Sequence, residues 1–136
     1  MGIATIGGGR QTGDGNVGEI ALSMQGDPAT ATSTATLTAA QLATGIVLGS
    51  PSTSAASYTL PTVALLEALL GNVRKNHSFD FSVCNVDGSS SGVITMVAGT
   101  GWTLVGLVTI AATAGTTGRF RARKTGDGAW TLYRLS

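Results

Sequence analysis

The sequence is poor in charge and in cysteine, and each shortage excludes a class of protein. Charged residues make up 11% of the 136 residues, against about 25% in a typical soluble domain. The single cysteine, Cys84, excludes an intramolecular disulfide framework and fits folding in a reducing, cytoplasmic compartment. A formal net charge of +1 gives no general attraction to nucleic acid or to an anionic membrane. We therefore expect neither nucleic acid nor a membrane as a partner.

Long hydrophobic runs are missing as well. Gly, Thr and Ser interrupt every apolar-leaning segment before it reaches the roughly 18 residues that span a bilayer. The N-terminal stretch MGIATIGGGR has neither the basic region nor the apolar run of a secretory signal. We expect a chain that is neither secreted nor inserted in a membrane.

The residue patterns of common catalytic sites are also absent. His77 is the only histidine, and one cysteine with scattered acids does not make a usual metal site. Gly8 to Gly13 have the spacing of a phosphate-binding loop, but Asp14 stands where that motif needs lysine. No GxSxG nucleophile elbow occurs. We predict a protein that is not an enzyme and that uses no cofactor, metal or small-molecule substrate.

Glycine, in contrast, is abundant, with 20 residues, and it is dense near the N-terminus. Because glycine is costly to order, we expect residues 1–30 to form an extended arm without regular structure. Two interpretations stay open: a flexible tail, or an arm that becomes ordered on a partner or a neighbouring subunit. Apolar residues favour the second, because a purely solvating tail has little use for them. The candidate contacts in the arm are Ile3, Ile6, Ile20, Leu22 and Met24.

One short helix stands out, at about residues 62–71, in the stretch TLPTVALLEALLGN. Thr62 is a suitable N-cap and Gly71 a suitable stop. The apolar face of this helix consists of Leu65, Leu66, Leu69 and Leu70. The stretch TLTAAQLATG can form a further helical turn between Thr38 and Gly45.

The remainder of residues 31–136, which we expect to form one domain, has the pattern of short strands. SFDFSVCNV alternates, so that Phe79, Phe81, Val83 and Asn85 share one face. Cys84 has apolar neighbours there, and we expect a buried, inert thiol. Strand runs with turn signals every 8–12 residues or so are typical of an antiparallel β-sandwich or jelly roll. The expected fold is therefore mainly β, an antiparallel sandwich or jelly roll with one short helix and an extended N-terminal arm.

The C-terminal stretch RFRARKTGDGAWTLYRLS has the pattern of a hairpin around a Gly-Asp-Gly turn. Its alternation turns Phe120 and Ala122 inward and the arginines Arg119, Arg121 and Arg123 outward. A row of cations also protects a strand edge. Three interpretations of this face stay open: a solvent or subunit-contact face, a contact with an acidic protein, and a nucleic-acid site. The last usually needs a wider basic patch.

Four motifs together resemble small virion proteins of tailed bacteriophages. They are TLP followed by a helix, SFDFSVxN, ITMVAGTGWTLVG, and a terminal FRARK…WTLYRLS hairpin. The resemblance covers roughly residues 37–136, and these motifs are structural rather than catalytic. The family is similar to head decoration, or cement, proteins, with a jelly-roll-like β-domain that trimerises on the capsid.

This resemblance implies a homotrimer on the outer surface of the virion, made in the host cytoplasm and bridging subunits of the major capsid protein. The arm residues and the three outward arginines would then be capsid or subunit contacts. An alternative is a trimeric tail-fibre or baseplate component that binds a host receptor. A secreted, trimeric signalling jelly roll is a third interpretation, which the missing signal and disulfides oppose.

Overall fold

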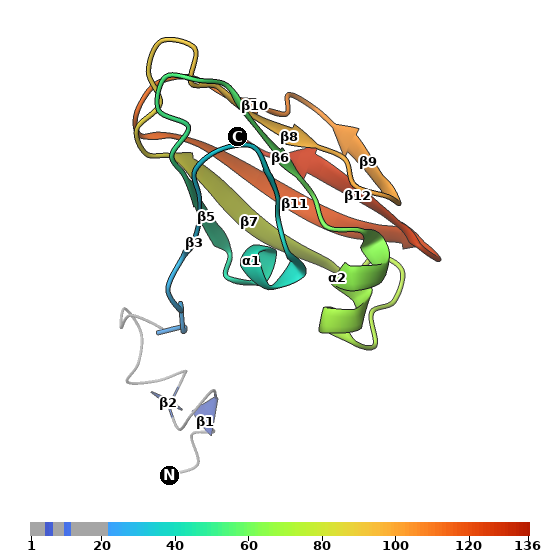
Figure 1. Cartoon of the computed structure of the whole chain (residues 1–136). Helices are drawn as coiled ribbons and strands as arrows, with labels where there is room; N and C mark the ends of the chain where they lie inside the picture. The colour runs from blue at the N-terminus through green and yellow to red at the C-terminus, as the bar shows by residue number, and fades with distance from the viewer. Residues whose placement is uncertain (1–4, 7–9, 12–21) are drawn as a thin grey trace.

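The structure is a computed structural model that describes residues 5–6, 10–11 and 22–136 (Figure 1). In the first two ranges, β1 (Thr5–Ile6) and β2 (Arg10–Gln11) pair antiparallel. The larger sheet contains β3 (Ala29–Ala31), β5 (Ile46–Gly49), β7 (Ser78–Asn85), β9 (Trp102–Val105), β11 (Thr116–Gly126) and β12 (Ala129–Arg134). The smaller sheet contains β4 (Ala35–Thr36), β6 (Ala56–Thr59), β8 (Ile94–Val97) and β10 (Thr109–Ile110). The helices are α1 (Ala39–Ala43) and α2 (Val63–Leu70).

Successive strands alternate between the two sheets from β3 to β11, so the chain winds around the core as a coil. From β3 to β8, each turn of the coil lays a strand parallel to its counterpart from the turn before. This gives the parallel neighbours β3, β5 and β7 in the larger sheet and β4, β6 and β8 in the smaller one. After β10, β11 pairs antiparallel with β7, and β12 lies between β11 and β9.

The predicted mainly β fold is confirmed, but the prediction of antiparallel sheets is wrong. From residue 22 onward, five of the eight strand pairs are parallel. The physical reason is that alternation shows which face of a strand is buried, and it contains no information on the direction of the neighbouring strand. Connections that pass through the opposite sheet return the chain in the same direction, as a crossover does.

The coil repeats one corner, in which a strand of the smaller sheet leads into a helix. The hydroxyl oxygens of Thr38 and Thr62 accept the N–H groups of Gln41 (3.1 Å) and Leu65 (3.3 Å). The buried Leu37 and Leu60 each stand just before these corners. The helix expected at residues 62–71 is thus confirmed, and the expected helical turn is a second short helix. TLT and TLPT mark equivalent corners of one coil, a repeat that the sequence analysis missed.

The core lies between the two sheets and continues beneath the helices. Phe81 of β7 stacks on Phe120 of β11, with ring centroids 5.6 Å apart. Trp102 of β9 and Trp130 of β12 lie 5.9 Å apart by the same measure. All four side chains are buried, and burying a large apolar side chain contributes roughly 1.5–3 kcal/mol. The alternation predicted for β7 and β11 is confirmed.

One buried polar residue, Asn85 at the end of β7, holds two loops in place. Its side-chain nitrogen donates to the carbonyl oxygens of Gly92 (2.9 Å) and Ala111 (3.0 Å), and its side-chain oxygen accepts the Gly88 N–H (2.7 Å). A Cβ atom at Gly88 would collide with this amide, so the loop needs glycine there. Alternation placed Asn85 inward correctly, and these hydrogen bonds explain how a polar group is tolerated there.

Candidate functional site

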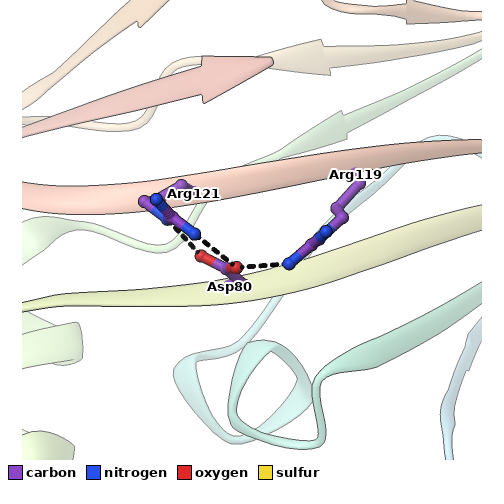
Figure 2. A network of polar contacts seen from close by, with 3 residues as sticks. All are labelled: Asp80, Arg119 and Arg121. Atoms are coloured by element: carbon purple, nitrogen blue, oxygen red, sulfur yellow. Dashed lines mark hydrogen bonds and ion pairs between the residues drawn. The ribbon is translucent and has the colours of Figure 1, made fainter. Parts of the chain in front are cut away.

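The outward row of arginines lies on the outer face of the larger sheet, as the sequence predicts. Asp80 of β7 stands opposite Arg121 of β11 (Figure 2). Its carboxylate accepts two hydrogen bonds from Arg121, at 2.7 and 3.0 Å, and one from Arg119 at 2.9 Å. The two hydrogen bonds from Arg121, followed by the one from Arg119, hold the pKa of Asp80 below its ordinary value. Bidentate pairing of this kind orients both groups.

Arg123, the third arginine of the row, binds neutral groups. Its Nε donates to the Tyr133 hydroxyl at 3.1 Å, and its Nη1 donates to the Asn76 side-chain oxygen at 2.7 Å. The guanidinium also lies 5.8 Å from the centroid of the Tyr133 ring. Asp80 is therefore the one carboxylate paired with this row among the residues from 22 onward. The face keeps an excess of positive charge, which a carboxylate-bearing surface complements.

Cys84 lies on this same outer face, where the prediction of a buried thiol is wrong. The side chain is half-buried, and its sulfur contacts the Thr117 hydroxyl at 2.8 Å. Alternation accounts for the outcome, because the inward neighbours Val83 and Asn85 leave Cys84 pointing away from the core.

A second surface is distinguished by the lack of charge. Residues 28–66, which form the first two turns of the coil, contain no Asp, Glu, Lys, Arg or His. Every ion pair found from residue 22 onward joins groups at position 67 or later. From residue 28 onward, the charged groups thus all lie at position 67 or later, and the first two turns of the coil present only neutral side chains.

Helix α2 lies at the boundary between the uncharged residues 28–66 and the charged part of the chain, and its one carboxylate faces the body of the protein. Glu67 accepts hydrogen bonds from Lys124 Nζ at 2.6 Å and from Trp130 Nε1 at 2.9 Å. The Lys124 hydrogen bond, followed by that of Trp130, lowers the pKa of Glu67 from its ordinary value. The predicted leucine face, in contrast, points mostly into solvent: Leu66 is buried, while Leu65, Leu69 and Leu70 are 62%, 50% and 39% exposed.

A groove of about 630 Å³ adjoins Leu65. Its walls are residues 36–39, 59–62 and 98–100, the segments at the C-terminal ends of the parallel strands β4, β6 and β8. Neutral side chains alone form the lining, with threonine hydroxyls among apolar groups. Three segments far apart in the sequence build the groove, so no local pattern predicts it. The charge-free span and the repeated TL corner were the signals available.

The first turn of the coil supplies an edge strand to each of the two sheets. β3 and β4 are the terminal strands of their sheets in the part of the chain described from residue 22 onward. The stretch that contains them, ATATSTAT, has no charge and no proline. Proteins commonly protect exposed sheet edges with charged residues or proline, and an edge without them is open to pairing with another strand.

The predicted arm contacts are only partly within the described residues. Leu22 and Met24 are 80% and 101% exposed. Next to them, the Gln25 side chain donates to the carbonyl oxygen of Thr44, which ends α1, at 2.6 Å. Ile3 and Ile20 lie outside the described residues, and Ile6 belongs to β1, where the backbone alone is described.

Residues 22–136 contain no group of three or more His, Cys, Asp or Glu side chains that could hold a metal ion. His77 Nδ1 accepts the Arg74 N–H at 3.2 Å, as part of a local turn. Neither α1 nor α2 has the length and apolar character of a membrane-crossing helix.

Comparisons of the chain with protein families, with curated proteins and with solved structures find no match. The functional conclusion therefore depends on the two surfaces and on the motifs of the sequence.

Proposed function

We propose that this protein is a structural component of a tailed-bacteriophage head. As a decoration, or cement, protein, it would trimerise on the outer surface of the capsid and stabilise the shell by bridging subunits of the major capsid protein. Its role would be non-catalytic and would require no cofactor. The resemblance of residues 37–136 to small virion proteins suggests this function.

The observation that best supports the proposal is the surface around α2. Three leucines of this helix are exposed while its carboxylate faces the body of the protein, beside a groove without charge. Contiguous apolar surface on a soluble chain usually marks an interface with another protein. A cement protein needs surfaces of this kind and needs no catalytic pocket.

The arginine row would provide a second contact of different chemistry. Arg119 and Arg121 are 55% and 48% exposed in their side chains, although both bind Asp80. An acidic surface of a capsid subunit would complement the positive charge that remains. In a trimer, three equivalent copies of each contact act together, so individually weak contacts give strong retention.

The copy number of the chain in purified particles, relative to the major capsid protein, tests the proposal. We expect about one copy per capsid subunit, or a fixed large fraction of that number, measured by quantitative mass spectrometry. A handful of copies per particle would favour the alternative, a tail-fibre or baseplate component that binds a receptor. Absence from particles would overturn both assignments.

Retention on capsids then tests the contact of the arginine row. Capsids would be mixed with wild-type protein, with Arg119→Ala/Arg121→Ala, or with Lys75→Ala as a control from an exposed loop. We expect the double variant to bind more weakly than wild type and to lose most of its salt dependence, with the control unchanged. Equal retention of all three would remove the arginine row from the capsid contact.

A further inference from the structure

We propose that the groove beside Leu65 receives Leu22 and Met24 of a second copy of this chain. The inference deepens the self-association that the proposed function includes, by naming the segment that one copy gives and the site that the other provides. It concerns the purified protein alone, so it can hold even if the chain has no role in a capsid.

The receiving site is suited to a neutral, partly apolar strand. Its three walls come from successive turns of the coil, and no charged side chain is among them. One wall begins at Thr36, where the terminal strand β4 ends, so a segment in the groove would also meet open backbone groups of that edge. Leu65 lines the groove and is 62% exposed. Leu69 lies one helical turn further along α2 and is 50% exposed.

The segment that one copy gives belongs to the same chain and exposes its apolar side chains. Leu22 and Met24 are almost fully exposed, two positions apart, in a stretch without helix or strand. Side chains at this spacing point to the same side when the backbone is extended. Isolated apolar residues at a surface are ordinary, but two beside each other on an anchored segment make a compact apolar contact.

The position of the anchor favours a second copy over the chain's own groove. Gln25 binds the carbonyl oxygen of Thr44, at the C-terminal end of α1, whereas Thr38 and Ala39 at the other end of this helix line the groove. With that anchor in place, the chain leaves its own Leu22 and Met24 in solvent. Figure 1 shows both helices at the end of the sheets from which the segment before β3 leaves.

Such a contact is heterologous, because each copy gives a segment on one surface and receives a segment on another. Heterologous contacts close into a ring when the rotation between neighbours allows it. A trimer would use three equivalent contacts and would leave no donor segment free.

Sedimentation velocity over a concentration series tests the inference on the purified full chain. We expect wild type to self-associate, and we expect both Leu22→Ser/Met24→Ser and Leu65→Ser to raise the apparent Kd about tenfold or more. Leu107→Ser is the matched control, since Leu107 is 66% exposed and does not line the groove. A wild type that stays monomeric at every concentration would overturn the inference, and so would equal effects of Leu65→Ser and Leu107→Ser.

Disulfide trapping identifies the contact directly and separates one copy from two. In a Cys84→Ser background, Met24→Cys protein is mixed with a tagged Leu65→Cys protein under mild oxidation. We expect a disulfide between the two different chains, and a much slower one when Leu107→Cys replaces Leu65→Cys, because bridging needs Cα atoms within about 7 Å. Equal rates would contradict the proposed contact. A Met24→Cys/Leu65→Cys chain that closes a disulfide within one monomer would show that the groove receives its own segment.

These outcomes are independent of the capsid test. Association through the groove together with absence from particles would leave the inference standing and overturn the proposed function. Abundance in particles together with a purified chain that remains monomeric would overturn the inference and leave the proposed function standing.

Discussion

The first two coil turns and the C-terminal part of the chain pack around the same core, but they differ in strand pairing and in charge. Residues 28–66 use parallel neighbours, threonine caps and small side chains, and they contain no charged group. Residues 67–136 contain the antiparallel strands β7, β11 and β12, the stacked aromatic side chains, and every ion pair found from residue 22 onward. The charged part pairs much of its charge internally but keeps an excess of positive charge on the arginine row. The uncharged part leaves Leu65 exposed and supplies the edge strands β3 and β4.

The largest effect should come from the aromatic core of the C-terminal part. Phe120→Ala removes a side chain with no exposed surface, stacked on Phe81 and lying under the Arg134 guanidinium. We expect a loss of about 3–5 kcal/mol in the free energy of unfolding, measured with urea. Leu65→Ala is the matched change on the coil side, and at 62% exposure it should alter stability by less than about 0.5 kcal/mol. Comparable losses in both variants would show that the exposed leucine belongs to the fold.

A smaller effect should follow from a change at the buried Asn85 amide, which joins two loops of the C-terminal part. Asn85→Ala deprives one N–H group and two carbonyl oxygens of their partner inside the protein. We expect unfolding to become easier by about 2–3 kcal/mol, with faster hydrogen exchange in the loops around Gly88 and Ala111. Ser82→Ala, on the outer face of the same strand, should be nearly neutral. Unchanged exchange in these loops would mean that water replaces the amide.

The Glu67 pair tests whether the boundary helix depends on charge. Glu67→Gln keeps an acceptor for Trp130 but leaves the mostly buried Lys124 without a counter-ion. We expect a loss of about 1–2 kcal/mol near neutral pH.

The pH dependence of the same variant follows from the lowered pKa. The unfolded state binds a proton near the ordinary value of 4.5, and the folded state binds it at a lower pH. The stabilisation is therefore complete above pH 4.5 and is lost as pH falls through the folded pKa. Urea denaturation at a series of acid pH values should show a shallower fall for Glu67→Gln than for wild type. Parallel curves would rule out this carboxylate as a source of acid sensitivity.

The smallest effect should come from the exposed pairs of the arginine row. Asp80→Asn breaks contacts between side chains that are 29% to 55% exposed, so stability should fall by less than about 1 kcal/mol. The difference from wild type should shrink as salt is added, since salt screens exposed pairs. Thermal unfolding at low and high salt measures this. A loss as large as that of Glu67→Gln would indicate that the outer face contributes to the fold as much as the boundary helix does.

The parts of the fold that were predicted from the sequence depend on short-range patterns. Alternation in SFDFSVCNV and RFRARK indicated the inward faces of β7 and β11, and Thr62 and Gly71 delimited α2. The parallel pairing could not be predicted in this way. Ala29 pairs with Val47, and Ala56 pairs with Ile94, because the chain passes through the other sheet between them. No local pattern specifies such a connection.

Of the candidate sites, too, only those that lie within one strand or helix could be predicted from the sequence. The arginine row is a property of one strand, and its outward direction was predicted correctly. The groove exists only once three corners of the coil are stacked, so no single stretch of the sequence indicates it. The leucines of α2 were recognised as an apolar face, but helical periodicity cannot tell a face that packs on the core from one that is exposed to solvent.

The place of β12 in the larger sheet affects the order in which the protein can fold during synthesis. β9 is translated before β12, yet it joins that sheet by pairing with β12. Until residues 129–134 are available, β9 has no neighbour in that sheet, and Trp102 has no Trp130 to pack against. The nascent chain can wind its coil turns early, but the sheet is complete only after residue 134 has been synthesised. During that interval β9 and the β12-facing edge of β11 are unpaired and Trp102 lacks its partner, and such edges are the sites at which an incomplete chain aggregates.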